Sequence, residues 1–395
     1  MGQRDPMSAA CVYHQPIMTS PRATNPQPPA AEPSRRAANR LGLDYQQEAA
    51  KLASPPSGII DVHTHINGPR SAAIYRRVAR LYGVSLVYSM TQLERIERVR
   101  EVLGDSVRFI AVPDYTSPDR LFHHGPGYVQ RLKRFGALGV RIAKFWAAPR
   151  GIDFGREVGD PDLLRLDSPA RLEAMKVAAD MGMIFMTHIA DPDTWFATKY
   201  ARASVYGSKA AQYEPLEALL ERFDVPWIAA HMGGWPEDLS FLSDLLRRHN
   251  NLYLDTSAAK WMVRELSRHS RDELVAFFRR WQGRILFGSD TLTDDEHLKA
   301  SAGEQEVLNR AGSAGEAFEL YASRYWSLRT LFESDYHGPS AIADPDLALV
   351  EPDRYDELDA PTLAGKSLPA DLLQSLYHDA AHDLLSPLYE MRKRS

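Results

Sequence analysis

Cysteine is almost missing from this sequence. Cys11 is the single cysteine in 395 residues, which excludes an internal disulfide framework and a cysteine-rich zinc module. Long hydrophobic runs are missing too, since no stretch approaches the ~18 apolar residues of a membrane helix. No apolar core follows the first methionine, as a signal peptide would require. We therefore expect a cytoplasmic protein with no membrane partner.

Positive charge is not in excess either. The chain has 47 basic and 52 acidic residues, a net charge of −5, with no long block of one sign. A protein that neutralises many phosphates is normally basic, so no nucleic-acid partner is expected. Hydrophobic residues make up 44% of the chain, which is ordinary for a globular protein and excludes a disordered scaffold or a fibre. The remaining class is a soluble globular protein.

Proline is concentrated at the N-terminus. Residues 1–56 hold 9 of the 26 prolines, and proline removes backbone donors and disfavours a packed core. We interpret residues 1–56 as a largely disordered tail, with a short helix expected at 43–53. A mitochondrial transit peptide stays open as an alternative, because arginine outnumbers acidic residues there.

From Gly58 onward, short apolar runs alternate with segments of helix length. Such alternation is typical of βαβ units around a parallel sheet, and eight runs match a (β/α)8 TIM barrel in number and length. An open doubly wound sheet is the second choice, but no glycine fingerprint follows Val62. The eight predicted strands are 58–62, 84–88, 107–112, 139–146, 183–188, 226–231, 252–256 and 284–289.

About a hundred residues follow the last predicted strand. Aromatic and aliphatic residues recur every three or four positions over 315–333, which predicts an amphipathic helix. A Pro/Asp-rich loop at 338–362 and a last helix near 369–385 follow. We expect the barrel to occupy residues 57–300 and a helical extension packed on it to occupy 301–395. The 318–332 face could serve a homo-oligomer interface.

Histidine and aspartate fall at the ends of predicted strands. His63 and His65 are two apart in the first strand, so both side chains point the same way. His188 ends the fifth run, His231 ends the sixth, and Asp290 follows the eighth. The carboxyl ends of barrel strands open on one face, where active sites lie. Three histidines and a carboxylate suit zinc or a neighbouring divalent metal. The pair His123–His124, beyond the third strand, is a further candidate for this face.

Four motifs carry a family resemblance. DVHTHI (61–66), THIAD (187–191), AAHMGG (229–234) and LFGSD (286–290) resemble the amidohydrolase superfamily. More narrowly, they resemble its amidohydrolase-related branch, which includes aminocarboxymuconate-semialdehyde decarboxylase and resorcylate-type decarboxylases. The resemblance covers residues 58–290.

The resemblance implies a ligand set and a reaction. His63, His65, His188 and Asp290 would hold one Zn²⁺, or another divalent ion such as Mn²⁺, and His231 would polarise the substrate or relay a proton. In hydrolytic members, metal-activated water gives its proton to Asp290 and attacks a C–N or C–O bond. Decarboxylating members use the same single-metal site on aromatic or muconate-like acids. The ligand set does not separate the two, and hydrolysis is preferred as the commoner chemistry of the superfamily.

Other candidates come from their position at strand ends. Lys144, in the fourth strand, would bridge two metals if carboxylated, steer an anionic substrate as an ammonium, or form a structural ion pair. Arg70 with Lys144 would favour a carboxylate-bearing substrate. The aromatic candidates for pocket walls are Tyr115, Trp146, Trp195, Trp235 and Trp261.

Overall fold

The computed structural model describes residues 37–298 and 311–390. Residues 1–36 of the expected tail and residues 301–310 of the expected extension lie outside the described residues. None of the helices within the described ranges is long and apolar enough to cross a membrane.

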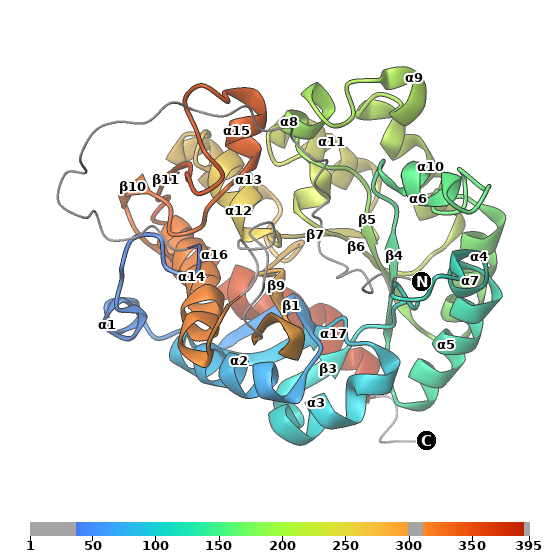
Figure 1. Ribbon diagram of the computed structural model, residues 1–395, viewed down its shortest axis with the longest axis horizontal. Coiled ribbons are helices and arrows are strands. Elements are labelled where there is room, and N and C mark those ends of the chain that lie inside the picture. Colours follow the sequence, from blue (N-terminus) through green and yellow to red (C-terminus); the bar gives the residue numbers. More distant parts are fainter. Residues whose placement is uncertain (1–36, 299–310, 391–395) are drawn as a thin grey trace, which may run out of the picture.

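Parallel strands form a TIM barrel ringed by helices (Figure 1). One arc has the order β3-β2-β1-β9 and the other β4-β5-β6-β7-β8. A parallel bridge between Ala111 and Ala143 joins the arcs on one side. On the other side, the Val62 amide donates to the Phe287 carbonyl at 2.9 Å and closes the ring. The strands are β1 (Ile59–Ile66), β2 (Val84–Ser89), β3 (Val107–Phe109), β4 (Ile142–Trp146), β5 (Ile184–His188), β6 (Trp227–Ala229), β7 (Leu252–Asp255), β8 (Ile285–Leu286) and β9 (Thr291–Thr293).

The eighth barrel strand is interrupted. β8 and β9 are separated by residues 287–290, and the break contains Asp290 at φ 55°. β9 then pairs with β1 from Thr64 to Ile66. Each of the eight apolar runs therefore contains or overlaps a strand, and only the eighth strand resumes beyond its run.

The helices between the strands begin where the sequence supplies caps. In α7, the Ser168 hydroxyl accepts from the Arg171 amide and Pro169 fills the first turn, while Ser270 and Glu273 form a capping box on α13. The helices between β1 and β9 are α2 (Pro69–Leu81), α3 (Ile96–Leu103), α4 (Arg120–His124), α5 (Pro126–Ala137), α6 (Gly151–Arg156), α7 (Pro169–Asp180), α8 (Asp193–Ala197), α9 (Ala203–Tyr206), α10 (Tyr213–Arg222), α11 (Leu239–Arg248), α12 (Ala259–Leu266) and α13 (Arg271–Arg280). Short 3-10 turns are η1 (Leu93–Arg95), η2 (Gly104–Ser106), η3 (Ala210–Gln212), η4 (Met232–Gly234) and η5 (Asp295–Leu298).

The chain after residue 310 packs on the barrel. α14 (Ala314–Glu333) matches the helix expected at 315–333 and contacts α2 and α12. The expected loop at 338–362 contains more structure, namely β10 (His337–Pro339), which pairs with β11 (Thr362–Ala364), and α15 (Asp346–Val350). The last elements are α16 (Ala370–Gln374), the π-helix η7 (Ser375–Asp379) and α17 (Ala380–Glu390). In Figure 1, α17 lies behind the strands.

The segment 37–56 is more ordered than expected for a tail, and its helix lies where one was expected, at 43–53. This helix is α1 (Tyr45–Ala50), which begins at the Asp44 cap and lies beside α14 (Figure 1). Tyr45 and Ala49 are buried in this contact. Their burial compensates for the conformational entropy lost in ordering so short a helix. The number of prolines in the segment does not reveal this burial.

Candidate active site

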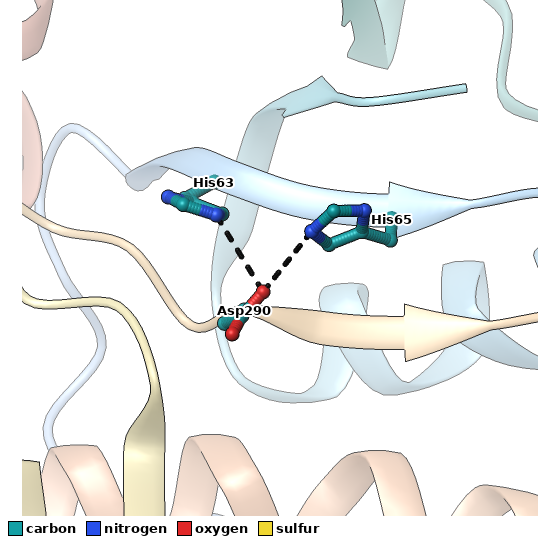
Figure 2. A group of neighbouring side chains, drawn as sticks. All are labelled: His63, His65 and Asp290. Carbon is teal, nitrogen blue, oxygen red and sulfur yellow. Dashed lines mark ion pairs between the residues drawn. The ribbon is translucent and has the colours of Figure 1, made fainter. Parts of the chain in front are cut away.

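The ends of β1 and the eighth strand bring three predicted ligands together. His65 Nε2 lies 3.2 Å and His63 Nε2 3.5 Å from Asp290 Oδ1 (Figure 2). The His63 side chain is 1% exposed, His65 17% and Asp290 30%, so Asp290 is the member that solvent reaches most. These three residues form a group whose ligand atoms could share one metal ion.

His188 and His231 form a second pair that adjoins the first. His188 Nδ1 lies 3.1 Å from His231 Nε2, and the His231 ring centroid lies 5.1 Å from that of His63. Both residues are buried. The five residues expected at the carboxyl end of the barrel therefore lie in one continuous cluster.

A residue that the sequence analysis missed fixes the protonation of His63. Asp255, the last residue of β7, accepts a hydrogen bond from His63 Nδ1 at 2.9 Å. Burial raises the pKa of Asp255, but the charge and hydrogen bond of His63 outweigh it and leave that pKa well below its usual range. An ionised carboxylate only accepts, so Nδ1 carries the proton and the Nε2 lone pair faces Asp290.

The same reasoning applies to His231. Ser257 Oγ donates to Asp255 Oδ1, so it accepts from His231 Nδ1 at 2.8 Å. His231 Nε2 therefore presents a lone pair toward His188. Burial, followed by the charge of His188, holds the pKa of His231 well below its usual value, which favours this neutral form.

His188 is oriented from the opposite side. Its Nε2 lies 2.9 Å from Asp191 Oδ1, and Asp191 Oδ2 also accepts from Tyr200 at 2.6 Å. With Nε2 donating to the carboxylate, Nδ1 turns its lone pair toward His231. The ligand atoms of His63, His188 and His231 thus face inward as acceptors.

These facing lone pairs repel one another unless a cation lies between them. Burial, followed by the charge of Lys144, lowers the pKa of His63, so protonation of this histidine is disfavoured. Burial raises the pKa of Asp290, but the hydrogen bond from His65 and the charge of His63 outweigh it, leaving that pKa well below its usual range. Neutral imidazoles and an ionised carboxylate are the donor set of Zn²⁺ and also suit Mn²⁺. The residues present therefore fit a divalent metal ion.

Left-handed backbone occurs at three strand ends around this cluster. His231 and Met232 after β6, Ala258 after β7, and Asp290 between β8 and β9 have φ between 50° and 64°. Such values are uncommon for residues other than glycine and cost of order 1–3 kcal/mol each. Two of these residues, His231 and Asp290, belong to the cluster itself.

The other predicted residues occupy varied positions. Lys144 is buried near His63, and the Trp146 ring lies 6.1 Å from His188. Tyr115 packs against His124 at 5.5 Å, on the side of β3 and β4. Arg70 is exposed in the first turn of α2.

The remaining tryptophans divide into two groups. Trp261 lies 5.5 Å from His231, and Trp195 lies 5.4 Å from Trp261. Trp235 instead stacks on Tyr213 at 5.6 Å, in packing between η4 and α10. The aromatic wall of the cluster is therefore formed by Trp146 and Trp261, with Trp195 behind Trp261.

With this geometry in view, comparison with known families is decisive. The amidohydrolase family model matches residues 60–386. The chain belongs to the amidohydrolase family. The match confirms the resemblance inferred from the four motifs and identifies the chain as an enzyme. It also runs past residue 300, where the sequence analysis placed the end of the barrel.

Solved structures are similar to this amidohydrolase at low identity. A 2,6-dihydroxybenzoate decarboxylase from Rhizobium is 14% identical, with 69% of this chain and 99% of that chain covered and a TM-score of 0.31. The 5-carboxyvanillate decarboxylase from Novosphingobium aromaticivorans, complexed with manganese and 4-hydroxy-3-methoxy-5-nitrobenzoic acid, is 10% identical, with coverages of 83% and 96% and a TM-score of 0.41. An amidohydrolase from Burkholderia multivorans is 14% identical, with coverages of 66% and 98% and a TM-score of 0.37. A search of curated proteins finds no match.

Proposed function

We propose that this amidohydrolase is a metal-dependent hydrolase that cleaves a C–N or C–O bond of a small molecule. The observation that carries the proposal is the set of inward-facing lone pairs on His63, His188 and His231 beside the ionised Asp290. His63, His65, His188 and Asp290 would hold one divalent ion, Zn²⁺ or Mn²⁺, with His231 beside it. Such an ion lowers the pKa of water toward ~7 and polarises a carbonyl oxygen.

Asp290 is suited to accept a proton at the reacting centre. Its carboxylate is ionised at neutral pH because its pKa lies well below the usual range. With 30% of its side chain exposed, it is open to an incoming water molecule or substrate. We assign to it the removal of a proton from the attacking water and the return of that proton to the leaving group.

His231 is suited to pass a proton on. Its Nε2 lone pair accepts the proton, and the resulting imidazolium is stabilised through Ser257 by Asp255. Because burial lowers the pKa of His231, a proton taken up at Nε2 is readily released. This tautomer favours proton relay over polarisation of the substrate by a donated hydrogen bond.

The first test is the metal content of the purified protein. We expect about one zinc or manganese per chain by elemental analysis, with the metal lost in His63→Asn. His249→Asn is the matched control, since His249 is a buried histidine that pairs with Glu217 outside the cluster. A protein that binds no divalent metal under any loading condition would overturn the proposal.

The second test separates the two reactions of the superfamily. The metal-loaded enzyme is assayed against lactones, amides and aromatic acids, with acid release and CO₂ release recorded side by side. Acid release from lactones or amides is the expected outcome. CO₂ release from an aromatic or muconate-like acid, without hydrolysis, would instead identify a decarboxylase.

A further inference from the structure

A buried arginine lies on the barrel wall next to the cluster of four histidines and Asp290. Arg171, in the first turn of α7, is 0% exposed, and its Nη2 donates to the Trp146 carbonyl at 2.9 Å. Within residues 37–298 and 311–390, its Nε and Nη1 have no hydrogen-bond partner. One N–H donor on Nε and two on Nη1, three of the five donors of a guanidinium, are therefore unused.

No acidic side chain in the described part of the chain forms an ion pair with Arg171. Among the described residues, the groups that act most on it are the phenols of Tyr115 and Tyr128, while burial lowers its pKa. A guanidinium does not lose its proton in proteins, so it cannot relieve the cost of burial by becoming neutral. Buried charges are normally paired, which points to an anion that the protein itself does not supply.

A second buried polar atom lies in the same neighbourhood. His124, at the end of α4, is 4% exposed, and its Nδ1 has no hydrogen-bond partner in the described part of the chain. Burial and then the charge of Arg171 lower the pKa of His124 to about 3, so this imidazole is neutral at physiological pH, and its Nδ1 donates to an anion when it carries the proton. The α4–α5 junction lies against α7, because α5 packs on α7 and a Cβ added at Gly125 would meet the Ala170 side chain at 3.9 Å.

Trp146 lies between this neighbourhood and the histidine cluster. Its carbonyl accepts from Arg171, and its ring lies 6.1 Å from His188. Tyr115, whose ring lies 5.5 Å from that of His124, is only partly buried, as is Trp146. A ligand could therefore contact both rings while one end lies at Arg171 and the other near the cluster.

We propose that Arg171 and His124 form a carboxylate-binding subsite, and that the substrate of this enzyme carries a carboxylate at the end remote from the bond that reacts. The location of this subsite relative to a reacting bond rests on the proposed function. Carboxylate binding itself does not require the metal ion. It also differs from the anion site expected from Arg70 and Lys144, because Arg70 is exposed on α2.

The test is binding of benzoate to metal-free protein, with benzamide as its neutral analogue. An aromatic probe suits a subsite beside Tyr115 and Trp146. We expect benzoate to raise the Tm of the wild type in a concentration-dependent manner, and benzamide to leave it unchanged. A wild type that responds equally to both ligands, or to neither, would overturn the subsite.

Arg171→Met separates ligand binding from folding. It keeps the length of the side chain, so we expect the ligand-free Tm to stay level or rise and the benzoate response to be lost. The matched control is Lys176→Met, which removes one positive charge from the exposed side of α7 and should leave the response intact. A benzoate response that survives in Arg171→Met would contradict the proposal.

Arg171→Lys is the second variant, in case the methionine variant does not fold. It keeps the charge but loses the planar fork, so we expect benzoate affinity to fall at least tenfold. Unchanged affinity would argue against recognition by Arg171.

Metal content is recorded on the same samples. Metal binding without a benzoate response would refute the subsite alone, and the reverse result would refute the metal centre alone.

Discussion

At the scale of single residues, Asp255 has the widest influence on the active site. Its two oxygens contact His63, Ser257 and the backbone amide of His231, and so set the tautomers of two histidines. Metal-binding histidines depend on such partners to aim the ligand nitrogen. Asp255 thus orients the histidines that surround the proposed metal site.

Asp255→Asn should weaken metal binding without removing a ligand. An amide can donate to His63 Nδ1, so this nitrogen is no longer required to carry the proton. We expect a loss of 10–100-fold in metal affinity, measured by competition with a chelator. Asp224→Asn, an exposed change of the same kind, is the control. Unchanged affinity in a folded Asp255→Asn protein would refute this role.

The sequence predicts the histidines and Asp290 because they end strands and belong to four motifs. Asp255 also ends a predicted strand, within 252–256, but aspartate is common after strands and its role lies in hydrogen bonds. Arg171 carries even less signal. Within the helical segment 169–181, an arginine is typical of a solvent-exposed position, and its burial depends on how α7 packs against α5.

At the scale of elements, the C-terminal segment around α15 supports the aromatic wall. Trp261 Nε1 donates to Asp346 at 3.1 Å, and Lys260 and Lys199 approach the same carboxylate at 3.2 and 3.4 Å. Asp346 is 1% exposed. Burial raises its pKa, but the charges of Lys260 and Lys199 outweigh it, so the carboxyl stays ionised.

Asp346→Asn should destabilise the protein by about 1–3 kcal/mol, because the buried carboxylate that binds Trp261, Lys260 and Lys199 loses its charge. We expect the urea midpoint to fall and the tryptophan emission to shift as the acceptor of Trp261 changes from a charged to a neutral group. The control is Asp353→Asn, an exposed change in the same segment. If both variants have the same urea midpoint as the wild type, the contacts of Asp346 do not stabilise the fold.

Strands were the most predictable elements, since each apolar run forms one. The interruption of the eighth strand was not predictable, because a positive φ at Asp290 depends on the tertiary hydrogen bond from its amide to the His63 carbonyl at 2.8 Å. The small strands β10 and β11 were missed for a similar reason. They are short, and their pairing joins segments on either side of α15.

At the scale of the whole molecule, the first strand is tied to the last part of the chain. Tyr325 on α14 donates to Asp61 on β1 at 2.7 Å, across 264 positions. Asp61 also accepts from the Ser289 amide at 3.1 Å. Burial outweighs these hydrogen bonds and raises the pKa of Asp61 to about 7.

Tyr325→Phe should cost about 1–3 kcal/mol, because the ring stays in place while a buried carboxyl loses a donor. Tyr321→Phe is a close control, since the Tyr321 hydroxyl, on the same helix, has no hydrogen-bond partner within the described ranges. We expect urea unfolding at pH 8 to separate the two variants. Equal stabilities would mean that the Asp61 contact contributes nothing.

The closure of the barrel also has a consequence for protein synthesis. β1 leaves the ribosome early, yet its partners across the seam include Ser289, 228 positions later than Asp61. Until Ser289 has been synthesised, one edge of β1 has no neighbouring strand, and unpaired edges promote aggregation. We therefore expect the nascent chain to depend on chaperones, and folding to be slow, until the eighth strand emerges.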